Sequence, residues 1–168
     1  MQFIEEYFTQ EKNLSILFIV CGIISIVIAA LFFAIIKYTL YKGVAIIFFI
    51  LGLIQLSVGN FVFSQTNSNI TRVTSAFTSQ NNFDKNVEIE RMRHVVLNLS
   101  IFRFSEIIFL LIGIGLIIFC KRPTQQFWKG IGLGLAIQAC LLFTLDFIAH
   151  RNAEVYLNAL IKITSGNT

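Results

Sequence analysis

The side chains best placed to do chemistry in this sequence are ionisable groups inside long apolar runs. Glu106 and Arg103 interrupt the run from Leu97 to Cys120, and Asp146 lies in a second run from Gly130 to Ala149. Each run is long enough to cross the hydrocarbon core of a bilayer. A charge at such depth is unfavourable unless it is paired, protonated or turned toward a polar cavity, so these residues are candidates for a functional site.

Further polar residues share helical faces with these three. Residues separated by three or four positions lie on one side of a helix, and both runs have such a polar stripe. If the runs pack as antiparallel neighbours, the stripes should meet in an intramembrane cluster of Arg103, Glu106, Gln138, Asp146 and His150. Contact between Arg103 and an acid would offset a cost of about 2.5–3.5 kcal/mol for each charge near a helix centre. Three interpretations remain open: a salt-bridge network that fixes helix register, a cavity for a ligand, proton or ion, or a catalytic site.

Two pairs of residues have a spacing that metal sites use. Glu90 and His94 are four positions apart, as are His150 and Glu154. Polar helix ends normally carry such residues without binding metal or haem, and no second ligand pair of recognisable spacing accompanies them. We therefore expect no metal and no cofactor.

Motifs of the common catalytic sites are absent. The sequence has no glycine-rich phosphate loop followed by lysine, no His-Glu-x-x-His, no Gly-x-Ser-x-Gly and no Cys-x-x-Cys. The sequence therefore favours a role other than an enzyme's.

The composition is that of an integral membrane protein. Hydrophobic residues make up 56% of the chain, charged residues only 13%, and the mean hydropathy is +0.77, whereas charged residues approach a quarter of a soluble domain. The net charge of +4 does not point to nucleic acid, because the basic residues lie at the ends of apolar runs and not in a patch with aromatics. Membrane lipid is the expected surrounding.

Four apolar runs reach the length of a membrane span. Two short connections join them in pairs, so each pair should form an antiparallel hairpin. The predicted fold is an all-α integral membrane four-helix bundle in a single domain, residues 1–168. The expected spans are Leu14–Ile36, Val44–Phe63, Leu97–Cys120 and Gly130–Ala149. Gly130 and Gly134 have the spacing of close helix packing, which we assign to packing inside the chain, with dimerisation as the alternative.

The polar connection from Ser64 to Val96 has helical periodicity. Apolar side chains recur in it at 3- and 4-residue steps, which predicts an extramembrane hairpin built from extensions of the second and third helices. Its apolar positions are Ile70, Val73, Phe77, Ile89 and Met92. The alternative is a disordered polar loop. We expect the third helix to begin near Asp84, the fourth to continue to about Ile163, and residues 3–8 to form a short interfacial turn.

These features favour a small multipass protein that binds a membrane or envelope partner. The hairpin residues Ile70, Val73, Phe77, Ile89 and Met92 would supply the contact surface, and the role would be that of an accessory subunit or an immunity-type protein, with a homo-oligomer as a further option. The alternative function is proton- or ion-coupled transport or sensing through Arg103, Glu106 and Asp146. A membrane enzyme acting on a lipid or quinone is the third.

The distribution of basic residues gives two answers on orientation. The flanks of each helix place the short loops, with Lys37, Lys42, Lys121, Arg122 and Lys129, in the cytoplasm. A raw count of Lys and Arg on each side gives the opposite result. Because the rule acts on short loops close to helix ends, we expect an inner-membrane protein with termini and long loop outside the cytoplasm.

Overall fold

Four long helices make up the chain. The one proline of the sequence, Pro123, lies between the third and fourth helices, at a position where a helical turn tolerates the missing N–H. The computed structural model describes residues 2–78 and 82–165. Its elements are α1 (Gln2–Ile35), α2 (Thr39–Thr78), α3 (Asn82–Phe119), the short 3-10 turn η1 (Pro123–Gln125) and α4 (Gln126–Ser165).

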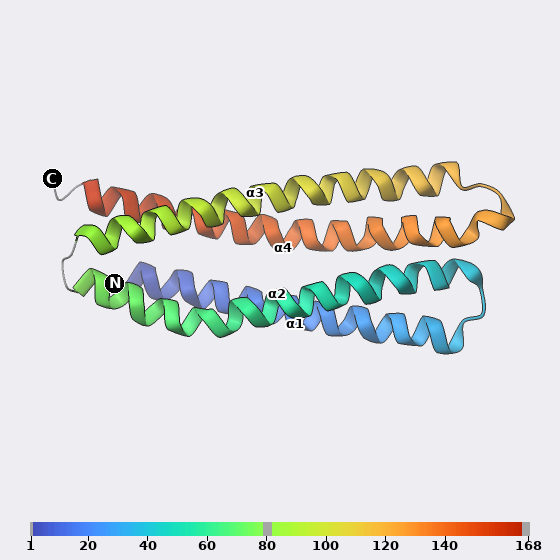
Figure 1. Cartoon of the computed structure of the whole chain (residues 1–168), viewed down its shortest axis with the longest axis horizontal. Helices are drawn as coiled ribbons and strands as arrows, with labels where there is room; N and C mark the ends of the chain where they lie inside the picture. Colours follow the sequence, from blue (N-terminus) through green and yellow to red (C-terminus); the bar gives the residue numbers. More distant parts are fainter. Residues whose placement is uncertain (1, 79–81, 166–168) are drawn as a thin grey trace.

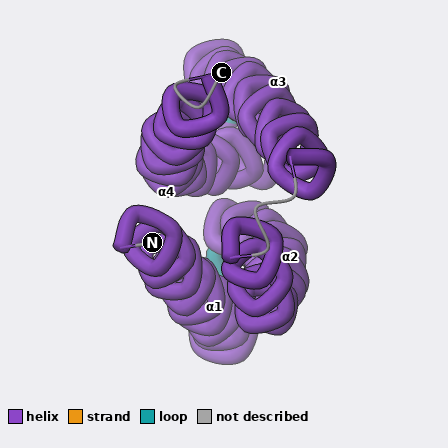
Figure 2. Tube along the Cα trace, turned by 90° about the vertical axis from the view of Figure 1, so that its left-hand side faces the viewer, coloured by secondary structure: helices purple, strands orange, loops and turns teal. Residues whose placement is uncertain are grey.

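The helices form two antiparallel hairpins, α1 with α2 and α3 with α4 (Figure 1). The short connections of both hairpins lie at one end of the molecule, and the two termini lie at the other. Between the hairpins, the main contact is α2 with α4, while α2 and α3 touch over only a small area. The end-on view in Figure 2 shows the hairpins as two layers.

Glycines allow the backbones to approach closely at two kinds of crossing. Within the second hairpin, a Cβ atom on Gly113 would lie 2.7 Å from the Gly132 carbonyl oxygen, a distance that real side chains do not adopt. Between the hairpins, a Cβ on Gly130 would collide with the Leu40 carbonyl oxygen, and Gly134 packs against Val44 of α2. The Gly130–Gly134 pair is therefore used for packing inside the chain, as predicted.

The helices are longer than a bilayer requires. They contain 34 to 40 residues, or about 51–60 Å at the helical rise, whereas the hydrocarbon core is about 30 Å thick. All four are long and apolar enough to cross a membrane. Each helix is therefore longer than a single crossing of the hydrocarbon core requires.

The end of the bundle that carries the termini has a core of its own, which we call the terminal core. All four helices contribute to it, and the Tyr7 and Tyr156 rings stack in it with centroids 4.1 Å apart. Its buried members are Ile4, Tyr7, Phe8, Val73, Met92, Ala153, Tyr156 and Leu160. At this end, the polar extensions of α2 and α3 thus pack with α1 and α4 in a four-helix structure and do not form a separate hairpin.

The predicted fold class is confirmed, with one correction at the N-terminus. Four helices form two hairpins, and α2 and α3 continue through the polar segment up to Thr78 and from Asn82. The prediction of a short interfacial turn at residues 3–8 is wrong, because α1 is continuous from Gln2 and buries Ile4 and Phe8 in the terminal core. Phe77 and Asp84 lie in α2 and α3, but their side chains are outside the described part.

Candidate functional site

A cavity of about 380 Å³ separates the two hairpins in the half of the bundle nearer the termini. All four helices line it, mainly with aliphatic and aromatic side chains. The acidic members of its wall are Glu11, Glu106 and Asp146, and the aromatic members include Phe18, Phe102 and Phe109. A cavity of this size and character is typical of sites for small molecules.

Glu106 of α3 and Asp146 of α4 form the polar centre of this cavity. Both are buried, with 6% and 8% of their surface exposed, and their side chains are within interaction range of each other. Among the described residues, no group donates a hydrogen bond to the buried Oε2 atom of Glu106. A buried polar atom without a hydrogen-bond partner is unfavourable by about 1–3 kcal/mol.

Arg103 does not make the predicted direct contact with either acid. None of the ion pairs in the described part of the chain includes it, and its guanidinium lies over the Phe147 ring, 5.9 Å from the centroid. The Arg103 Nε atom is buried without a hydrogen-bond partner there. The direct pairing was therefore a wrong prediction: Glu106 turns into the cavity and Arg103 turns toward Phe147. Attraction between Arg103 and both acids persists at longer range.

His150 takes part in a contact between α3 and α4. Its Nε2 atom lies 2.9 Å from the Ser100 hydroxyl oxygen, and its Nδ1 atom lies 3.5 Å from a Glu154 carboxylate oxygen. The other spaced pair, Glu90 and His94, lies on an exposed face of α3 with 3.6 Å between His94 Nε2 and Glu90 Oε1. Within the described residues, no group of three or more potential ligands could hold a metal ion.

Gln138 belongs to a different polar centre, deeper in the bundle. Its amide nitrogen donates to the Ser25 hydroxyl at 2.7 Å, and its carbonyl oxygen accepts from the Gln55 amide at 3.3 Å. Gln55 and Gln138 are each 1% exposed. We call Ser25, Gln55 and Gln138 the polar triad; it joins α1, α2 and α4. Ser25 and Gln55 were missed from the sequence because attention to charge passes over neutral polar residues, although each interrupts an apolar run.

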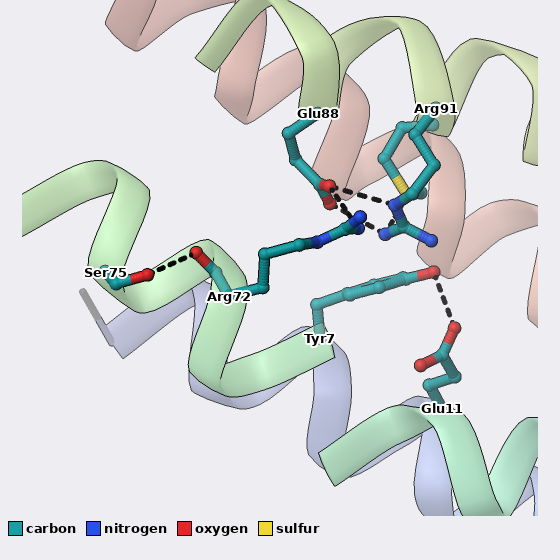
Figure 3. A network of polar contacts seen from close by, with 7 residues as sticks. Tyr7, Glu11, Arg72, Ser75, Glu88 and Arg91 are labelled. Carbon is teal, nitrogen blue, oxygen red and sulfur yellow. Dashed lines mark hydrogen bonds and ion pairs between the residues drawn. The ribbon is translucent and has the colours of Figure 1, made fainter. Parts of the chain in front are cut away.

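A network of hydrogen bonds and ion pairs lies where the cavity meets the terminal core. Glu11 lines the cavity and accepts hydrogen bonds from the Tyr7 and Thr66 hydroxyls, both at 3.2 Å. Figure 3 shows the neighbouring ion pairs. The carboxylate of Glu88 in α3 pairs with the guanidinium of Arg72 in α2 and with that of Arg91 in its own helix. This network connects the two hairpins on the side of the termini.

The predicted partner-binding residues face the interior more than the surface. Val73 and Met92 are fully buried in the terminal core, and Ile70 and Ile89 are partly buried against it. The periodicity of these residues reflected core packing, and Val73 and Met92 offer no surface to a partner in this conformation.

Comparison with known proteins finds no matching family model, no matching curated sequence and no matching solved structure.

Proposed function

We propose that this four-span membrane protein binds a lipid-soluble molecule in the cavity between its hairpins, as a step in transport or sensing. The observation that carries the proposal is the buried acid Glu106, which lines a cavity of about 380 Å³ and whose Oε2 atom has no hydrogen-bond partner among the described residues. Buried polar groups inside a membrane are costly and are found mainly where they serve a function.

A purely structural role for Glu106 has less support. A structural ion pair would place Arg103 against the acid, because an unpaired buried charge is strongly destabilising. Arg103 instead contacts Phe147, and the polar triad already provides hydrogen bonds between helices deeper in the membrane. A ligand, a proton or an ion in the cavity could therefore interact with the Glu106 carboxyl group, which forms no ion pair with Arg103.

Mass spectrometry of the intact protein released from detergent tests this proposal. Ala149 lines the cavity, so Ala149→Phe should fill it and abolish retention of a lipid-soluble molecule that the wild type carries. Ala30→Phe is the matched control, because Ala30 lies on the exposed face of α1. Equal retention by all three proteins, or retention by none, would contradict the proposal.

Partner binding is a second candidate function, favoured by the extension of the bundle beyond the bilayer. Exposed apolar side chains on this extension, Val87 of α3 and Val155 of α4, would supply contacts that Val73 and Met92 cannot. A photo-crosslinking amino acid at Val87 or Val155 should give a discrete product in native cells, with a protein partner or a second copy of the chain. Only uncrosslinked protein at both positions would rule this candidate out.

The orientation that goes with both candidates places the termini and the terminal core outside the cytoplasm of an inner membrane. Ser75→Cys, on the exposed end of α2, should then react with an impermeant maleimide in intact cells, and Thr124→Cys in η1 should not. Both positions are exposed, so accessibility to water does not bias the comparison. The opposite labelling pattern would reverse the topology.

A further inference from the structure

Resting on the proposed function, we infer that the ligand is a cationic amphiphile: an amine or quaternary ammonium head bound at Glu106 and Asp146, with an apolar tail along the cavity wall. The inference comes from the charge of the wall, the side chains around the acids, and the routes that the packing leaves open.

The charge of the wall favours a cation. Of the described residues that line the cavity, three are acidic and none is basic. Glu11 already accepts two hydrogen bonds, whereas Glu106 retains an oxygen without a donor. One guanidinium, that of Arg103, attracts both Glu106 and Asp146 without forming an ion pair with either. An additional positive charge between the carboxyl groups would therefore be attracted by both.

The surroundings of the acids suit an alkylammonium head and an alkyl tail. Phe18, Phe102 and Phe109 line the same cavity, and aromatic faces attract cations, most strongly where water is excluded. Beyond them the wall is aliphatic, with Leu51, Ile54, Val58, Val62 and Leu142 among its members. A head with methyl or methylene groups would match this lining better than a hydrated metal ion.

The helices pack more tightly at the two ends of the bundle than along the sides between the hairpins. At the short-loop end, α2 and α4 meet backbone to backbone at Gly43 and Gly130. At the opposite end, the terminal core and the Tyr7–Glu11–Thr66 hydrogen bonds cover the cavity. On the sides of the bundle, α2 contacts α3 less than α1 contacts α4, and both contacts are smaller than that of α2 with α4. The side between α2 and α3 is therefore the favoured route of access, which suits a molecule that partitions into the bilayer before it binds.

Binding of matched amphiphiles in nanodiscs of zwitterionic lipid tests the inference. The reporter protein carries Trp128→Phe, which removes the one natural tryptophan, and Phe18→Trp, which places a fluorophore on the cavity wall. The probes are dodecyltrimethylammonium, its uncharged carbon isostere and dodecyl sulfate, each corrected for partition into empty nanodiscs. We expect the cation to bind at least about tenfold more tightly than the isostere, a difference of about 1.4 kcal/mol.

Variants in the reporter protein identify the groups responsible for the preference. Glu106→Gln and Asp146→Asn should each reduce the preference for the cation to less than about threefold, whereas Glu5→Gln, at an exposed acid outside the cavity, should leave it unchanged. Equal binding of cation and isostere, or tighter binding of the sulfate, would overturn the ligand class and leave the cavity function in place. If no probe binds and Ala149→Phe also retains as much lipid-soluble material as the wild type, both the ligand class and the proposed function fail.

Discussion

The polar triad and the Glu106–Asp146 pair are both buried inside the apolar bundle, yet their hydrogen bonding differs. In the triad, the Gln138 amide bonds both Ser25 and Gln55 and so links three helices, although the Gln55 Oε1 atom has no hydrogen-bond partner among the described residues. No described cavity-lining residue belongs to the triad. At the acid pair, a carboxylate oxygen lacks a donor and both side chains line the cavity. Both centres contain a buried atom without a hydrogen-bond partner, but only at the acid pair does the residue that carries this atom line a cavity that a ligand could fill.

The largest loss of stability is expected when the triad loses its central residue. Gln138→Leu removes two hydrogen bonds and leaves Ser25 and Gln55 buried without Gln138, which should lower the free energy of unfolding by about 1–3 kcal/mol. Unfolding in mixed micelles with increasing SDS measures this change. The double variant Gln55→Leu/Gln138→Leu should recover part of the loss, and an unchanged Gln138→Leu variant would mean that the triad contributes nothing.

A somewhat smaller effect is expected at the ion pairs outside the acid pair and the triad. Arg91 makes two hydrogen bonds to the buried carboxylate of Glu88, at 2.7 and 2.9 Å, so Arg91→Ala should cost about 1–2 kcal/mol. The side chain of Arg72 is 56% exposed, so Arg72→Ala should lower the free energy of unfolding by less than about 1 kcal/mol. The same unfolding assay compares Arg91→Ala with Arg72→Ala. A larger loss of stability for Arg72→Ala would mean that Arg72, and not Arg91, is the main partner of Glu88.

A loss smaller than that of Arg91→Ala is expected at Arg103, although it lies beside the acid pair. Its close contact is with the Phe147 ring, so Arg103→Leu should lower the free energy of unfolding by roughly 0.5–1 kcal/mol. Adding Glu106→Gln should restore little, because no direct ion pair is broken. A loss above about 3 kcal/mol that Glu106→Gln largely rescues would instead indicate a buried salt bridge.

The sequence predicted the elements better than it predicted which side chains meet. Continuous apolar runs located the spans, because lipid accepts apolar side chains on every side of a helix, and 3- and 4-residue steps located the polar extensions, because a helix with one covered face has that periodicity. The second pattern also explains why Val73 and Met92 were assigned to a surface: periodicity shows that a face is covered, not what covers it. The helical spacing of Ile4, Tyr7 and Phe8 was present, but their alternation with Glu5 and Glu6 was interpreted as a short interfacial turn.

The candidate site was predicted only in part, because sequence patterns indicate which helices face each other but not which side chains touch. The polar stripes located Glu106 and Asp146 correctly on facing helices, because α3 and α4 had to pack as a hairpin. The three-residue step from Arg103 to Glu106 permitted contact without requiring it, and small rotations of α3 decide which of the two turns into the cavity. Ser25 and Gln55 come from the other hairpin, so their meeting with Gln138 depends on how the hairpins pack, which local sequence patterns do not determine.

The most direct test of the role of the acid pair measures stability and bound molecules in the same preparations of Glu106→Gln and Gln138→Leu. The proposed role of Glu106 as a binding group predicts that Glu106→Gln unfolds within about 0.5 kcal/mol of the wild type or becomes more stable, while mass spectrometry of the intact protein shows loss of the lipid-soluble molecule. Gln138→Leu should show the opposite, with reduced stability and the molecule retained. A Glu106→Gln protein that loses more than about 1 kcal/mol of stability and keeps its bound molecule would contradict this role.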